Sequence, residues 1–106
     1  MATTKDYKDF VLDKLSLLEN ITCKTMMGEY LLYYNQILFG GIYDNRFLVK
    51  MVNGNKRYHM QEVIPYDGAK PMYLVEEIDD PNRVKEIIID TCKDLLVKNN
   101  KKQSHK

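Results

Sequence analysis

The chain has 106 residues, the length of one small domain, since domains commonly run from about 50 to 200 residues. Its hydrophobic fraction of 44% and charged fraction of 29% are ordinary for a globular protein and argue against disorder and membrane insertion. No apolar run approaches the roughly 18 residues of a membrane helix, and residues 1–9 lack the basic start and apolar stretch of a secretory signal. We therefore expect a cytoplasmic protein without membrane contact.

Charge is unevenly distributed along the chain. The net charge is +1, yet Lys98, Lys101, Lys102 and Lys106 all lie at the C-terminal end, and the remainder has 12 basic against 15 acidic residues, or about −3. We predict one domain, residues 1–97, and a flexible basic tail, residues 98–106, in which Lys98, Lys101 and Lys102 are candidate phosphate contacts. Such a tail would bind nucleic acid weakly or indirectly, and a solvated, frayed terminus is the simpler interpretation.

The first predicted element is an amphipathic helix over residues 5–18. Its apolar residues recur at the three- and four-residue spacing of a helix: Tyr7, Phe10, Val11, Leu15 and Leu18. Thr3 or Thr4 can cap the first turn, because a threonine hydroxyl accepts from a free helix amide. Asn20 and Thr22 then break the pattern, since their side chains favour turns.

The segment from Met26 to Val52 predicts a three-stranded antiparallel meander. Asn35-Gln36 and Asp44-Asn45 mark its two hairpin turns, because Asn and Asp tolerate the left-handed backbone of tight turns. The predicted strands are residues 29–34, 37–43 and 46–52.

Neither face of the predicted middle strand is polar. Ile37, Phe39 and Tyr43 are expected to point one way, and Leu38 and Ile42 the other. Apolar residues on both faces suggest that a second copy of the chain or another protein covers the second face. Simple exposure is the alternative, because a tyrosine ring can pack while its hydroxyl stays in water.

Gly40-Gly41 lies inside this strand, where glycine is costly and often marks a bulge or a close backbone approach. A phosphate-binding loop would need spaced glycines, a following helix and a lysine, which this segment lacks. The candidate partner surface consists of Tyr33, Phe39, Gly40, Gly41 and Tyr43.

The rest of the chain predicts a short helix, a strand pair and a long helix. The short helix covers residues 55–61, and the strands, residues 63–66 and 72–77, flank a turn at residues 67–70. Asp80 and Pro81 are a strong helix start, because Asp caps free amides and Pro suits the first helical position. Asn99 and Asn100 are expected to end this last helix.

These elements predict an α+β fold with two layers, in which an antiparallel sheet of about five strands packs against helices from both chain ends. Both helices have wide apolar faces. Contact between the two helices on the same side of the sheet explains that width, and a dimer or partner surface is the alternative.

Side chains suited to catalysis are sparse. The histidines are His59 and His105, and no serine or cysteine forms a recognisable set with them. Cys23 and Cys92 are expected to be reduced, buried thiols, because two distant cysteines make neither a disulfide framework nor a zinc site. We therefore expect a protein without enzyme activity, metal or cofactor.

Several motifs between about residues 8 and 97 define a resemblance to a known family. They are Ile21-Thr22, Met26-Met27-Gly28-Glu29-Tyr30, Leu32-Tyr33-Tyr34, Leu38-Phe39-Gly40-Gly41-Ile42, Leu48-Val49-Lys50, Tyr66-Asp67-Gly68-Ala69-Lys70-Pro71-Met72 and Asp79-Asp80. In these motifs, in their order and in their spacing, the chain resembles the N-terminal domain of the TfoX/Sxy family. That family is linked to the regulation of natural DNA-transformation competence in bacteria.

The resemblance implies an α+β domain similar in architecture to type III secretion chaperones, with no enzyme activity. Full-length relatives add a C-terminal domain of the helix-hairpin-helix kind, so we expect a stand-alone N-terminal domain here. Glu29 and Asn35-Gln36 depart from the glycine-rich segment and the Asp-Gly-type turn of many relatives, which suggests a distinct subgroup.

We expect a noncatalytic regulatory or adaptor domain that acts through protein contacts, with the transcription or competence machinery as partner by analogy, or as a homodimer. Weak nucleic-acid binding through the tail is one alternative. The other is small-molecule sensing in a pocket around Gly40-Gly41, Lys50 and Lys70.

Overall fold

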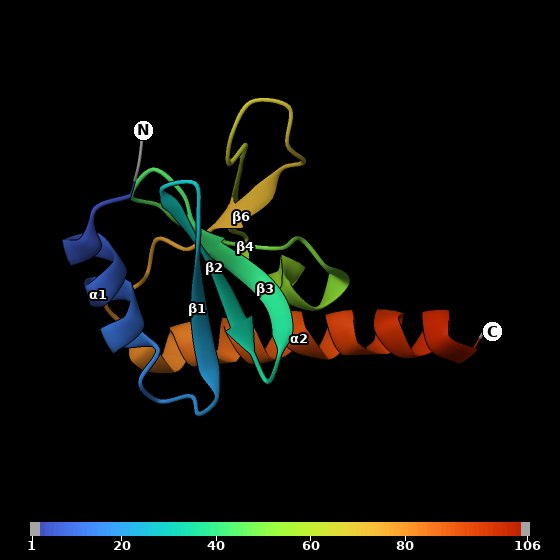
Figure 1. The fold of residues 1–106 in the computed structure, drawn as a ribbon. Coiled ribbons are helices and arrows are strands. Elements are labelled where there is room, and N and C mark those ends of the chain that lie inside the picture. The colour runs from blue at the N-terminus through green and yellow to red at the C-terminus, as the bar shows by residue number, and fades with distance from the viewer. Residues whose placement is uncertain (1–2, 105–106) are drawn as a thin grey trace.

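A six-stranded antiparallel sheet with a helix from each end of the chain makes up the protein (Figure 1). The computed structural model describes the backbone of residues 3–104 and the side chains of residues 3–97. The elements are α1 (Lys5–Lys14), β1 (Ile21–Met26), β2 (Glu29–Tyr34), β3 (Ile37–Ile42), β4 (Phe47–Val49), the 3₁₀ helix η1 (Asn53–Tyr58), β5 (Gln61–Val63), β6 (Met72–Leu74) and α2 (Pro81–Ser104). The predicted α+β class is confirmed.

The sheet is open and has the strand order β1-β2-β3-β4-β6-β5. Strand β1 is the strand beyond the predicted five, and it pairs with β2 from Ile21 opposite Tyr34 to Met26 opposite Glu29. Its sequence carries a weak strand signal, because exposed Thr and Lys residues separate its few apolar ones. A tight turn joins the two strands, with positive φ angles of 50° at Met27 and 84° at Gly28.

The two predicted hairpin turns of the meander are confirmed. Asn35 and Gln36 have φ angles of 49° and 67°, and Asp44 and Asn45 have angles of 52° and 57°. Both residues of each turn are thus left-handed, as a two-residue hairpin with the native strand twist requires. β2 has its predicted bounds, whereas β4 is limited to three residues, Phe47–Val49.

A β-bulge in β3 changes which side chains share a face. Leu32 lies opposite Gly40, but the next residue, Tyr33, lies opposite Leu38, so Phe39 has no partner on β2. An extra residue shifts the alternation by one position. The prediction that Tyr43 shares a face with Phe39 is therefore wrong: Ile42 joins Phe39 in the core, and Tyr43 points to the other side.

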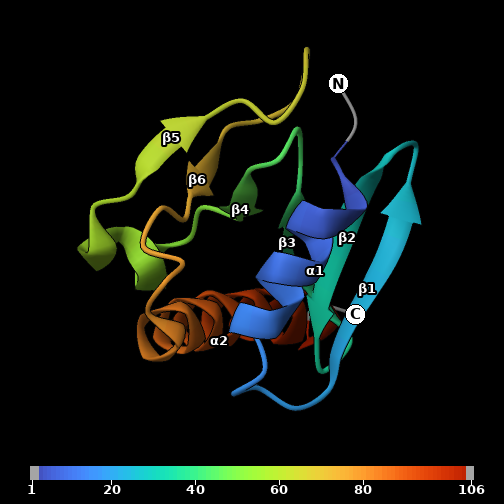
Figure 2. The same ribbon diagram turned by 90° about the vertical axis from the view of Figure 1, so that its left-hand side faces the viewer.

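Both helices pack on one face of the sheet, which curves around them (Figure 2). α1 ends at Lys14, four residues earlier than predicted, although Leu15 and Leu18 still enter the core. One core cluster joins the two helices to the strands, and its fully or nearly fully buried members include Val11, Leu15, Leu32, Phe39, Ile42, Phe47, Val49, Val84, Ile87 and Ile88. The wide apolar faces of the helices are thus largely used within the chain.

The C-terminal half differs from the prediction mainly in element bounds. The short helix begins at Asn53 rather than at residue 55, and β5 and β6 have three residues each. The Asp80 carboxylate accepts from the amides of Asn82 and Arg83 at 3.1 and 3.3 Å, which confirms the predicted start of α2. α2 continues to Ser104, past Asn99 and Asn100.

A buried asparagine that the sequence analysis did not single out fixes η1 against α2. Asn55 is 0% exposed, and its Oδ1 accepts from the amide of Val52 at 3.2 Å. Its Nδ2 donates to the carbonyl of Lys50 and to the hydroxyl of Thr91, both at 2.8 Å. This amide therefore joins the end of β4, η1 and α2 in one buried network.

Candidate functional site

The face of the sheet opposite the helices, here called the second face, carries apolar and aromatic side chains. Directly paired residues share a face, so Tyr33 and Leu38 lie together on it, as do Leu31 and Leu48 on either side of Gly41. Leu48 is 0% exposed although it lies outside the helix-side cluster. A side chain on the second face can be this buried only if another part of the protein covers it.

The connection between β5 and β6, residues 64–71, lies against the second face near Tyr43. The Arg46 Nη2 donates to the carbonyls of Ile64 and Pro65 at 3.4 and 3.2 Å, which ties this connection to the β3–β4 turn. The rings of Tyr43 and Tyr66 stack with centroids 5.9 Å apart and planes 9° apart. The same chain therefore lies against part of the face for which the sequence suggested cover by a second copy or another protein, with simple exposure as the alternative.

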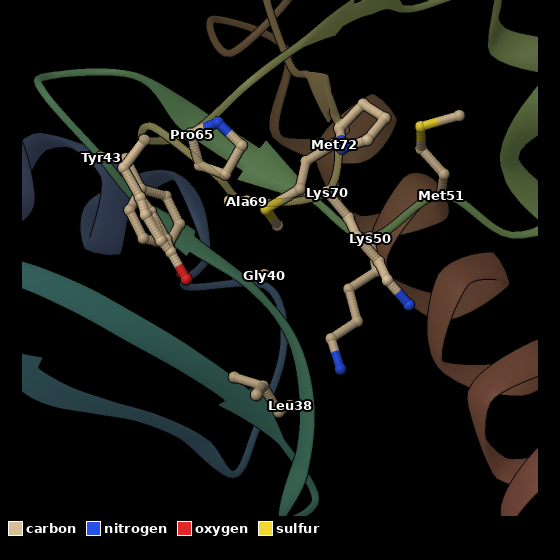
Figure 3. Close-up of a pocket in the computed structure, with 11 residues that line it drawn as sticks. Leu38, Gly40, Tyr43, Lys50, Met51, Pro65, Ala69, Lys70 and Met72 are labelled. Atoms are coloured by element: carbon tan, nitrogen blue, oxygen red, sulfur yellow. The ribbon is translucent and has the colours of Figure 1, made fainter.

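A pocket of about 600 Å³ lies between this connection and β3 (Figure 3). Its walls are mostly apolar, with side chains from Leu38, Met51, Pro65, Ala69, Pro71 and Met72. Its polar side chains belong to Tyr43, Tyr66, Lys50 and Lys70. Volumes of about 300 to 1,000 Å³ with mostly apolar walls and a few polar groups are typical of small-molecule sites.

Two glycines allow the backbone and side chains around this pocket to approach closely. A Cβ added at Gly40 would overlap the carbonyl oxygen of Leu48 and lie 2.8 Å from the Cα of Val49. At Gly41 it would lie 2.5 Å from the carbonyl oxygen of Tyr30 and 2.9 Å from the Tyr43 ring. The close backbone approach, one of the two features that the sequence suggested for Gly40-Gly41, is confirmed, and the bulge lies next to the pair at Phe39.

The charged side chains that line the pocket are both positive. Lys50 is half-buried and Lys70 is exposed, and none of the pocket's lining residues is acidic. Tyr43 lies across the pocket from the two lysines (Figure 3). Burial raises the pKa of the Tyr43 hydroxyl, with further contributions from Tyr66, Glu29 and Tyr33 nearby, so this group stays protonated and neutral at neutral pH.

The structure separates the residues of the predicted partner surface. Tyr43 and the backbone of Gly40 line the pocket, and Gly41 lies behind the Tyr43 ring. Tyr33 lies on the second face outside the pocket. The Nζ of Lys24 is 5.1 Å from the centroid of the Tyr33 ring. Phe39 does not belong to this surface, because it is 0% exposed in the helix-side core.

Of the alternative pocket residues proposed from the sequence, Gly40, Lys50 and Lys70 come together, whereas Gly41 does not line the pocket. Of residues 65–72, only Lys70 was proposed for the pocket from the sequence, because no hydrophobic periodicity defines this connection. Pro65 and Pro71 were a further signal there, since two prolines near strand ends restrict how such a connection can run.

The candidate phosphate contacts are outside what the structure describes. Lys98, Lys101 and Lys102 belong to the last turns of α2, and their side chains are not among those described. Among the described basic residues, Arg57 already has a partner, because its guanidinium pairs with the Asp90 carboxylate at 2.6 Å.

Within the described part of the chain, catalytic and metal-binding groups do not cluster. His59 ends η1 on the surface in a left-handed conformation, with a φ angle of 54°. Cys92 is buried as expected, whereas Cys23 is half-buried. Burial raises the pKa of both thiols, that of Cys92 to about 12, so both stay protonated at neutral pH. Residues 3–104 hold no group of three or more His, Cys, Asp or Glu that could bind a metal ion, and no helix there is long and apolar enough to cross a membrane.

Fold and site together define a class: an α+β domain with helices on one face of an open sheet and an apolar, lysine-bearing pocket on the other. No model of a protein family matches the chain. It is similar to the "uncharacterized 12.7 kDa protein in trpE 5'region" of Spirochaeta aurantia, with 31% identity over 80 residues that cover 74% of this chain and 70% of that protein. The chain belongs to the family of this spirochaete protein.

Proposed function

We propose that this protein is a noncatalytic regulatory or adaptor domain that binds a partner protein through the second face of its sheet. The observation that carries the proposal is the composition of that face at the pocket and beside it. Tyr33, outside the pocket, and Leu38, which lines it, lie opposite each other and remain half-exposed. Tyr66, which also lines the pocket, is 55% exposed. Tyrosine is enriched in protein interfaces because its ring packs while its hydroxyl can still bind a polar group or water.

The resemblance to the TfoX/Sxy N-terminal domain supports this proposal and suggests a partner in the transcription or competence machinery. The likeness to type III secretion chaperones, which that resemblance also implies, belongs to the same proposal. Two of the motifs that carry the resemblance, residues 38–42 and residues 66–72, supply much of the pocket on the second face.

The test is capture of partners from a nuclease-treated native lysate with the wild-type chain and a Tyr33→Asp variant. Tyr33 lies outside the pocket and outside the helix-side core, so its replacement should leave folding intact. We expect a bound transcription or DNA-uptake protein that the variant loses.

The matched control is Leu17→Asp, which changes an apolar side chain that is 47% exposed next to α1. It should capture the same partner as the wild type. The proposal fails if Tyr33→Asp keeps every captured protein. The molar mass of the purified chain in solution tests whether a second copy occupies the second face instead.

A further inference from the structure

The pocket on the second face has positively charged lysines and otherwise mostly apolar walls. Lys50 and Lys70 are its charged lining residues. Among the described residues, no carboxylate lies within ion-pair distance of either lysine. A complementary ligand must therefore carry a negative group for the lysines and an apolar part for the walls.

We propose that this pocket binds a small organic monocarboxylate, with the carboxylate held by Lys50 and Lys70 and the apolar body packed against Tyr43, Met51 and Met72. This inference goes beyond the proposed function and does not depend on a partner protein.

The lining favours a monocarboxylate over a more polar anion such as a nucleotide. A nucleotide would bring several charges and sugar hydroxyls against walls made of methionine, proline and leucine side chains, where unpaired polar groups are costly. A carboxylate on an apolar body presents one charged end, which two ammonium groups can satisfy with charge-assisted hydrogen bonds.

The site is also partly pre-organised. Leu38 and Met72 extend from strands, and the connection over them is fixed by the hydrogen bonds of Arg46 and by the Tyr43–Tyr66 stack. Less ordering on binding leaves more of the contact free energy as affinity. Met51 and Met72 are flexible side chains that can adapt to the shape of the ligand.

The test uses the full chain and two carboxylates, decanoate and phenylbutyrate. Neutral decanol and cationic decylamine serve for comparison, and each compound is used at a concentration at which it is dissolved and free of micelles. Binding is measured by calorimetry and by amide NMR spectra. We expect both acids to bind and to shift the amide signals of Gly40, Lys50 and Ala69, whereas decylamine does not bind.

The charge-removal variant Lys50→Gln/Lys70→Gln should weaken decanoate binding about tenfold or more and leave decanol unaffected. The control Lys56→Gln/Lys85→Gln removes two exposed lysines on η1 and α2 and should bind decanoate like the wild type. If the first variant fails to fold, Lys70→Gln alone, at an exposed position, should still weaken decanoate binding.

The inference is overturned if decanoate and decylamine bind equally, if the shifted signals lie outside the pocket, or if neither acid binds at millimolar concentration. Binding of a peptide with a free C-terminal carboxylate, without binding of either small acid, would also overturn it. Because these readouts need no captured protein, failure here and failure of the adaptor role are distinguishable.

Discussion

At the scale of single residues, Asn55 is a fully buried polar side chain that makes three hydrogen bonds. It binds the Val52 amide, the Lys50 carbonyl and the Thr91 hydroxyl. Replacement by Ala would remove these three hydrogen bonds from a buried site, although the Thr91 hydroxyl would keep its bond to the Ile87 carbonyl. We expect Asn55→Ala to lower the free energy of unfolding by roughly 2–4 kcal/mol, measured by urea denaturation.

The matched control for that substitution is Asn53→Ala. Asn53 begins the same 3₁₀ helix but is exposed, so its loss should change the free energy of unfolding by less than about 0.5 kcal/mol. Equal effects of the two substitutions would show that the Asn55 network does not stabilise the fold.

At the scale of elements, η1 is joined to α2 at its surface by Asp90 as well as in its interior by Asn55. Burial raises the pKa of the Asp90 carboxyl, but hydrogen bonds from Tyr58 and Arg57 outweigh this and lower it below its usual range. A carboxyl with a lowered pKa in the folded state stabilises the fold above its unfolded pKa of about 4, and this stabilisation is lost as pH falls through the folded pKa.

We therefore expect Asp90→Asn to lower the free energy of unfolding by about 1 kcal/mol at pH 7. The difference from the wild type should shrink progressively below about pH 4, where the wild-type carboxyl also becomes protonated. Chemical denaturation across this pH range provides the measurement. A difference that is independent of pH would contradict the ionic origin of the effect.

Some of these elements could be predicted from the sequence and others could not. Hairpin turns and the start of α2 depend on local residue chemistry, and Asn35-Gln36, Asp44-Asn45 and Asp80 gave them correctly. The faces of β3 were predicted wrongly, because Gly40-Gly41 suggested a bulge or a close approach but the position of the bulge, at Phe39, depends on pairing with β2. The pocket could not be predicted in full, because one of its walls is the connection of residues 64–71. Tertiary contacts with Arg46 and Tyr43, and not a local pattern, hold this connection against the sheet.

At the scale of the whole molecule, labelling of one thiol, that of Cys92, reports on opening of the core between the sheet and α2. Cys92 is 4% exposed in the helix-side core, and burial raises its pKa to about 12, so it is unreactive while the core is closed. In a Cys23→Ser variant, we expect a thiol reagent at pH 8 to label Cys92 only at the rate of core opening. Urea should accelerate this labelling together with the loss of the circular dichroism signal, and rapid labelling without urea would contradict a closed core.

The two faces of the sheet have different roles, because one forms the core and the other carries the pocket. The side chains that hold the fold together lie with the helices, whereas the pocket and the exposed tyrosines lie on the other face, largely under one connection. We therefore expect substitutions in residues 64–71 to change the pocket more than the helix-side core.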